Sequence, residues 1–293
     1  MPGRRRWRRW GLAFTGLTIL GLAGVWLVGS LLMRPSPSHV APAVAPARDL
    51  HVRATDGLDI AATYWPGRRP AAPAVLLLHG NGASRGAEAS TASWLSQQGY
   101  AVLTIDFRGH GESASASHSF GLFEARDAAA AFAWLKRRQD GAPVAVVGIS
   151  LGGAAALLGD KGPLPAQAMV LQAVYPDIRH AIRNRLVATG RMAAFGGLEP
   201  LLSFQSRLRL GVWPDTLAPI VRVRDVTCPV LVIGGSADRY TPPAETRALY
   251  DAVHRPRQLW WAAGADHAAV SHDESPAYRA TLLTFLRHTI GAS

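Results

Sequence analysis

The chain has 293 residues, 48% of them hydrophobic and 17% charged, a composition that supports a large buried core and excludes a mainly disordered protein. Its formal net charge is +11, but residues 1–48 hold seven arginines and no acidic residue, which leaves about +4 for the rest. That remainder has no basic stripe interleaved with aromatic residues, so we predict no nucleic-acid partner. The single Cys228 excludes an internal disulfide, and we assign it no chemistry.

The first segment in chain order is a basic cluster followed by an uncharged stretch. Five arginines lie within residues 1–10, and residues 11–33 contain no charged side chain. As a helix that rises ~1.5 Å per residue, this stretch spans roughly 35 Å, enough to cross a bilayer. Arginine clusters stay on the cytoplasmic side of a membrane. We therefore predict a basic cytoplasmic tail at 1–10, a single transmembrane helix at 11–33, and the rest of the chain on the outer side.

A cleaved secretory signal is the alternative for this segment, and it would leave a secreted protein. Small residues at Ala41–Ala43 and Ala45–Ala47 offer cleavage sites, and the pair Arg8-Arg9 leans towards a twin-arginine signal. The uncharged stretch is longer than the usual ~7 to 15 residues of a signal, so we favour the membrane anchor. Residues 34–48 are rich in proline and alanine, and we expect them to form a linker.

From residue 49 to residue 293, segments typical of strands and helices alternate, which predicts an α/β domain with a mostly parallel, doubly wound sheet. A hairpin over 50–64, turning at Asp56-Gly57, opens the sheet. The further strands are expected at 74–79, 100–105, 143–147, 167–173, 230–233 and 258–262, and the main helices at 87–98, 123–138, 151–158 and 280–289. The alternation breaks at about 176–226, where we expect a small helical cap over the carboxyl ends of the strands.

Ser150 lies directly after one of these strands, in the pentapeptide Gly148-Ile149-Ser150-Leu151-Gly152. Gly-x-Ser-x-Gly between a strand and a helix lifts a serine hydroxyl off the backbone, where a base can activate it as a nucleophile. A side chain at either glycine would collide in so tight a turn, and the serine itself must adopt strained dihedral angles.

Asp238 and His267 each follow a later predicted strand, so serine, acid and histidine occur in that order along the chain. Loops at the carboxyl edge of a parallel sheet are where sites form. The three residues therefore support one another as a catalytic set.

With these residues the chain resembles the alpha/beta-hydrolase superfamily, nearest to its serine aminopeptidase and lysophospholipase-like esterase branch. The resemblance covers roughly residues 50–286. The motifs that carry it are His79-Gly80-Asn81-Gly82, Asp106-Phe107-Arg108-Gly109-His110-Gly111-Glu112-Ser113, Gly148–Gly152, Gly235–Asp238 and Asp266-His267.

The resemblance implies a role for each residue of the set. Ser150 is the expected nucleophile, His267 the base, and Asp238 the acid that orients the histidine. The backbone N–H groups of Leu151 and Asn81 are the expected oxyanion hole. No cofactor and no metal is implied, and we predict neither.

Other residues that could enter such a site are predicted to be structural. Asp266 adjoins His267, but neighbouring side chains point in different directions. Asp106 is expected to brace the loop that follows it. His79 and His110 are expected to make structural hydrogen bonds within their loops, and Ser236 is expected to be a turn residue. His180, His254 and His272 have no partners at metal-ligand spacing, so we predict no zinc site there.

The function predicted is a membrane-anchored serine hydrolase that cleaves carboxylic esters, or alternatively thioesters or amides, through an acyl-enzyme. Its partners are then a small or lipid-like acyl substrate and the membrane. A peptidase or acyltransferase that uses the same triad, and a noncatalytic binding domain, are the alternatives. Arginines cluster with apolar residues in the predicted cap, where they either receive an anionic amphiphile or form a solvated helix face: Arg179, Arg183, Arg185, Arg191, Arg207 and Arg209. The sequence predicts no oligomeric state.

Overall fold

The computed structural model of the protein describes residues 3–188, 197–254 and 256–291. Eight strands of this part form one sheet in the order β10-β9-β8-β7-β4-β5-β3-β2. The pairs β2·β3 and β3·β5 are antiparallel and the others are parallel. The strands are β2 (Arg48–Arg53), β3 (Asp59–Trp65), β4 (Ala74–Leu78), β5 (Ala101–Ile105), β7 (Val144–Ile149), β8 (Ala168–Gln172), β9 (Val230–Gly235) and β10 (Arg257–Ala262).

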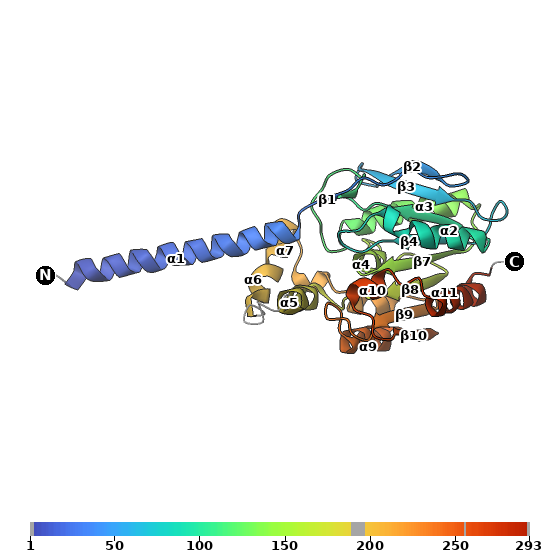
Figure 1. Ribbon diagram of the computed structural model, residues 1–293. Coiled ribbons are helices and arrows are strands. Elements are labelled where there is room, and N and C mark those ends of the chain that lie inside the picture. Colours follow the sequence, from blue (N-terminus) through green and yellow to red (C-terminus); the bar gives the residue numbers. More distant parts are fainter. Residues whose placement is uncertain (1–2, 189–196, 255, 292–293) are drawn as a thin grey trace.

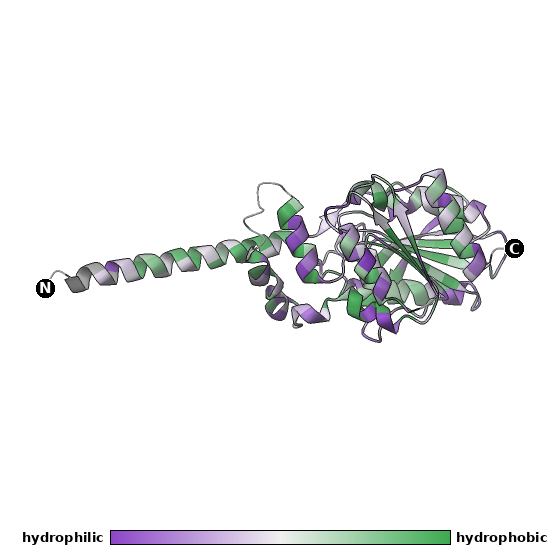
Figure 2. Cartoon of the chain, turned by 90° about the horizontal axis from the view of Figure 1, so that it is seen from below, coloured by the Kyte–Doolittle hydropathy of each residue, from purple (hydrophilic) through white to green (hydrophobic). Residues whose placement is uncertain are grey.

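Helices cover both faces of this sheet because its central strands are apolar on both sides (Figures 1 and 2). In β4, Leu76 and Leu78 belong to one core cluster, whereas Val75 and Leu77 belong to the other. The first cluster includes residues of α3 (Glu124–Arg138), α4 (Leu151–Leu157) and α9 (Pro243–Ala252). The second includes residues of α2 (Ala89–Gln97) and α11 (Pro276–Thr289). The expected alternation of strands and helices, and with it the doubly wound α/β sheet, is confirmed.

The cap follows β8 and contains α5 (Ile178–Ala188), α6 (Glu199–Ser203), α7 (Gln205–Arg209) and α8 (Pro219–Arg222). Its predicted range also includes residues 189–196, among them Arg191, which lie outside the described part of the chain. A third apolar cluster joins the cap to the sheet domain, with Ile178 and Leu202 packed near Ala154 of α4. The cap therefore sits over the helix that follows the serine turn.

The amino-terminal helix α1 (Gly3–Leu32) projects from the body of the molecule (Figure 1). By length and composition, Arg9–Leu32 is able to cross a membrane, and none of its most apolar stretch is buried. Among the described residues, α1 meets the rest of the chain through its carboxyl-terminal part, from Leu22 onward. The next residues continue along the body, where β1 (Ser36–Pro37) pairs in parallel with β6 (His110–Gly111). The division into tail, transmembrane helix, linker and hydrolase domain stays a prediction.

Candidate active site

Ser150 occupies the turn between β7 and α4 with φ 49° and ψ −108°, a conformation that an L residue rarely adopts. The neighbouring glycines allow this turn. A Cβ at Gly148 would lie 2.5 Å from the Cα of Gly153, and a Cβ at Gly152 would overlap the carbonyl oxygen of Leu78. The predicted strain at Ser150 and the predicted collisions at the two glycines are confirmed.

Asp238 and His267 come together from the loop after β9 and the first residue of α10 (His267–Ser271). His267 Nδ1 lies 2.8 Å from Asp238 Oδ2. The other carboxylate oxygen, Oδ1, accepts the backbone N–H groups of Tyr240 and Thr241, each at 2.8 Å. This buried carboxylate thus has one oxygen held by the backbone and one free to accept the Nδ1 proton, which leaves Nε2 of a neutral ring as a proton acceptor.

A pocket of about 310 Å³ brings Ser150 and His267 to one surface. Asp238 does not line it and lies buried behind the histidine. The ring of Tyr240 stands edge-on to the His267 ring with centroids 5.3 Å apart. The full lining is Gly80, Asn81, Ala83, Ile149, Ser150, Arg185, Tyr240, His267, Ala268, Ser271 and His272. The structure therefore brings the nucleophile and base that we expected into one pocket.

Both residues expected to form the oxyanion hole lie beside Ser150. Leu151 is the first residue of α4, so its N–H belongs to the first turn, which has no intrahelical acceptor. A Cβ at Gly80 would lie 3.7 Å from the Cβ of Ser150, so the loop that carries Asn81 passes the serine closely. Their role as oxyanion donors stays a prediction.

The loop after β4 is fixed by two buried histidines. Burial lowers the pKa of His79 to about 3, so the ring is neutral. Its Nδ1 lies 2.7 Å from Gly80 O, and its Nε2 accepts the backbone N–H of Phe107 at 3.1 Å. His110 Nε2 lies 3.3 Å from Asn81 Oδ1. Both histidines thus have the structural hydrogen bonds that we expected, and they hold the loop that passes Ser150.

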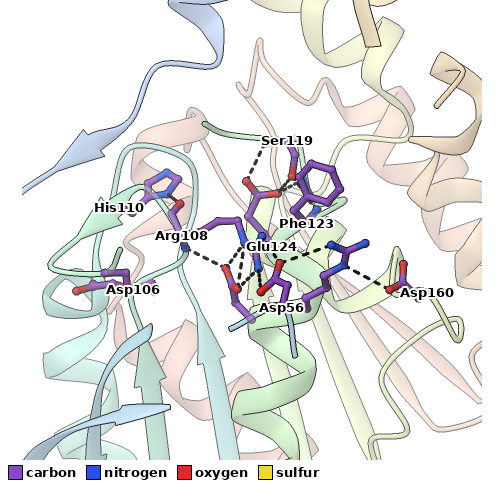
Figure 3. Close-up of polar contacts among 12 residues, drawn as sticks. Asp56, Asp106, Arg108, His110, Ser119, Phe123, Glu124 and Asp160 are labelled. Atoms are coloured by element: carbon purple, nitrogen blue, oxygen red, sulfur yellow. Dashed lines mark hydrogen bonds and ion pairs between the residues drawn. The ribbon is translucent and has the colours of Figure 1, made fainter. Parts of the chain in front are cut away.

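The loop after β5 is built around buried charges (Figure 3). Asp106 accepts the backbone N–H groups of Arg85 and Glu112 and pairs with the Arg85 guanidinium. Arg108 donates to Asp127 and to Asp56, at 2.7 and 2.8 Å in the closest contacts. Asp106 therefore braces this loop, as predicted, and is not a partner of His267.

The remaining polar candidates also have structural partners. Asp266 is exposed and caps α10, because its Oδ1 accepts the N–H of Ala269 at 2.9 Å. Ser236 accepts the N–H of Gly264, and His180 pairs with Asp177 at 2.7 Å. No group of three or more metal-binding side chains occurs within the described residues.

Gln172, which the sequence did not single out, connects the serine turn to the histidine helix. Its backbone carbonyl accepts the N–H of Ser150 at 2.8 Å. Its side chain donates to the carbonyl of Val270 in α10 and accepts the hydroxyl of Tyr278 at 3.0 Å. Gln172 therefore connects α10, which carries His267, to the turn that carries Ser150.

Gln172→Met is expected to lower kcat through this connection while leaving KM within about twofold. The variant leaves a buried carbonyl and a buried hydroxyl without partners, at about 1–3 kcal/mol each, and removes one of the bonds that hold α10 against the sheet. Gln139→Met is the matched control, because Gln139 is also buried and donates to Tyr64 at 2.8 Å, but Tyr64 lies in β3, which carries no residue of the candidate site. Thermal unfolding and ester kinetics of both variants separate the two effects. Equal changes of kcat in the two variants would refute the positioning role.

The chain is similar in sequence to several known proteins. The profile of a family described as serine aminopeptidase, S33, matches residues 69–206. An uncharacterized protein of Mycobacterium tuberculosis is 32% identical over 237 residues, which cover 80% of this chain and 75% of that protein. The lysophosphatidylserine lipase ABHD12 of Danio rerio is 28% identical over 194 residues, 64% of this chain and 49% of that protein.

Among solved structures, an esterase of Pyrococcus furiosus, Pf2001, superposes with a TM-score of 0.70. The match covers 88% of this chain and 99% of the esterase at 21% sequence identity. The alpha/beta hydrolase GrgF of a Penicillium species superposes with a TM-score of 0.64 at 18% identity, over 84% of this chain and 99% of that one. At these identities the likeness shows the fold alone.

Proposed function

The chain belongs to the alpha/beta-hydrolase superfamily, and from this premise we propose that it is a membrane-anchored serine hydrolase that cleaves carboxylic esters through an acyl-enzyme. The observation that carries the proposal is the Asp238–His267 pair, 2.8 Å apart, in the same pocket as a serine on a strained strand-to-helix turn. The relative described as a lysophosphatidylserine lipase supports this class of reaction.

The chemistry follows from the groups present. Ser150 Oγ attacks the ester carbonyl while His267 Nε2 takes its proton, and Asp238 stabilises the imidazolium that forms. The oxyanion of the tetrahedral intermediate accepts hydrogen bonds from the backbone N–H groups of Leu151 and Asn81. The alcohol leaves with the proton from His267, and an acyl ester remains on Ser150. Water, deprotonated by His267, then releases the carboxylic acid and restores the serine.

An aminopeptidase is the second candidate, because the matching family profile bears that description. An aminopeptidase must bind the free ammonium group of its substrate, which calls for a carboxylate near the nucleophile. No Asp or Glu occurs among the described residues that line the pocket, whereas Arg185 does. The pocket therefore favours an ester over an amino-terminal peptide.

A substrate panel tests the choice. Purified full-length protein in neutral detergent is offered short p-nitrophenyl esters, lysophospholipids and aminoacyl p-nitroanilides. We expect ester hydrolysis, and slower turnover of the aminoacyl anilides through the same acyl-enzyme. Turnover of aminoacyl anilides that exceeds turnover of every ester would support the peptidase instead.

The contacts of α1 support an anchor that stays attached. Arg209 donates to Trp26 O at 2.6 Å and to Ser30 Oγ at 3.0 Å, and its guanidinium lies 3.8 Å from the centroid of the Trp26 ring. Gln205 donates to Val25 O at 3.1 Å. A signal sequence that is cleaved off does not remain bonded to the folded cap, whereas a retained anchor does. We propose that α1 is retained as a single transmembrane anchor with its amino terminus in the cytoplasm.

These contacts also fix the position of the cap along α1, and hence relative to the proposed membrane. A hydrocarbon core of ~30 Å takes about 20 helical residues, so a span that begins at Gly11 ends near Ser30. The bonds of α7 to Trp26 and Ser30 thus lie at the outer end of the span. Leu201, Phe204 and Leu208 are exposed beside this end of α1. The cap therefore rests at the outer membrane surface, where a lipid-like substrate is available.

The retained anchor predicts a membrane-bound protein of full length. After carbonate extraction of cells that express it, the chain is expected in the membrane pellet, with an intact mass that includes α1. External protease is expected to reach the cap in spheroplasts. A soluble mature form that begins within residues 41–48 would establish the cleaved signal instead.

A further inference from the structure

The structure separates the cap arginines into those that have partners away from the pocket and one that faces it. Arg179 lies 3.2 Å from Asp215, and Arg183 lies 3.5 Å from Glu199. Arg207 donates to Gly211 O, and Arg209 binds α1. Arg191 lies outside the described residues. Of the described arginines and lysines, Arg185 alone lines the pocket of Ser150.

Arg185 has donors to spare at this position. Its Nη1 donates to Ala181 O at 3.3 Å, and its guanidinium lies 5.6 Å from the centroid of the Tyr240 ring. Every Asp and Glu of the chain falls within the described residues, and none forms an ion pair with Arg185. A guanidinium carries five N–H donors, so most of them remain available to a ligand.

The nearby carboxylates are engaged elsewhere. Asp238 is held by two backbone N–H groups and His267. Glu245 accepts the side chain of Asn184 at 2.8 Å. Arg185 therefore places a positive charge without a paired carboxylate at the wall of the pocket that contains Ser150. The other titratable groups of this wall are His267, His272 and the phenol of Tyr240.

We propose that Arg185 binds the anionic group of the substrate, so that the enzyme prefers esters that carry a carboxylate or a phosphate. The proposal rests on the ester hydrolysis proposed above. The planar guanidinium matches both anions in a bidentate arrangement, and an ion pair in a partly enclosed pocket is stronger than one in bulk water. The anionic group belongs either to the alcohol part or to the acyl part of the ester. The substrate pairs below distinguish these two positions.

Two matched substrate pairs test the proposal on the full-length protein in neutral detergent. Lysophosphatidate and the monoacylglycerol of the same acyl chain differ by an anion on the alcohol part. Mono-p-nitrophenyl succinate and p-nitrophenyl butyrate differ by an anion on the acyl part. Arg185→Gln is expected to lower kcat/KM for the anionic member of one pair by about 10- to 100-fold, since ionic hydrogen bonds of this kind have that effect. The neutral member is expected to change by less than about threefold.

Two further variants identify the cause. Arg185→Lys is expected to restore part of the preference for the anionic ester, because it returns the charge without the bidentate geometry. Arg183→Gln removes an equal charge from the same helix outside the pocket and is expected to leave both pairs unchanged. Equal losses on the anionic and neutral members, or no loss on either anionic ester, would overturn the assignment.

A binding measurement separates this inference from the proposed reaction. Titration calorimetry of Ser150→Ala with lysophosphatidate and with mono-p-nitrophenyl succinate reports affinity without turnover. Adding Arg185→Gln is expected to weaken one of the two by about tenfold or more. If that loss appears while the wild-type protein hydrolyses no ester, the anion site stands and the esterase proposal fails. Ester hydrolysis without any such loss of affinity would refute the anion site and leave the esterase proposal standing.

Discussion

Ser150→Ala is expected to lower kcat on p-nitrophenyl acetate by roughly 10⁵- to 10⁶-fold, because the variant has no nucleophile that can form the acyl-enzyme. The remaining turnover comes from the pocket and the oxyanion donors alone. No side-chain hydrogen bond of Ser150 occurs within the described residues, so the change should leave packing intact. The melting temperature is expected to stay within a few degrees.

The structure supplies a control for this experiment. Ser236 also lies in a loop after a buried strand, but its hydroxyl accepts the N–H of Gly264 and it lines no part of the pocket. Ser236→Ala is expected to retain activity within about threefold, because loss of one exposed hydrogen bond costs little. Turnover of Ser150→Ala within tenfold of the wild type would remove Ser150 from the mechanism.

Asp238→Asn is expected to lower kcat by about 10³- to 10⁴-fold, the second largest effect. The amide oxygen would take the place of Oδ1 and accept the N–H groups of Tyr240 and Thr241. The amide NH₂ would then face His267 Nδ1 and force that nitrogen to accept. The ring would carry its proton on Nε2, the atom that takes the proton from Ser150 in the proposed mechanism.

Asp266→Asn is the matched control for the acid. Asp266 adjoins His267 in sequence, but it is exposed and caps α10, and asparagine caps a helix nearly as well. Activity of this variant is expected within about twofold of the wild type, and its stability nearly unchanged. A larger loss in Asp266→Asn than in Asp238→Asn would exchange the roles of the two residues.

The fold and the core of the site could be predicted from the sequence because both depend on short, local patterns. Apolar runs such as Val144–Ile149 are buried on both faces and have to form central strands. Gly148 and Gly152 revealed the turn at Ser150 because only glycine fits beside it. Asp238 and His267 could be paired without a structure through the resemblance to the hydrolase superfamily, and their places after parallel strands agree with it, since such strands end at one edge of the sheet.

The rest of the site depends on contacts between distant segments, which leave no local pattern. Gln172 bonds to Val270 and Tyr278 from the end of a buried strand whose sequence has no feature that marks a functional residue. Arg185 could not be told apart from the other cap arginines, because helical spacing does not show which of them faces Ser150. The bond from Arg209 to Trp26 joins residues 183 positions apart. These features follow from packing and not from the order of residues.

Covalent labelling with a fluorophosphonate tests the central claim, that Ser150 is an activated nucleophile, most directly. The reagent phosphonylates a serine whose hydroxyl is activated by a neighbouring base far faster than an ordinary serine. After labelling of the full-length protein and digestion, we predict a single adduct on the peptide that contains Ser150. The adduct should be lost in Ser150→Ala and strongly reduced in His267→Ala. Absence of label in folded wild-type protein, or label on another serine, would contradict the mechanism.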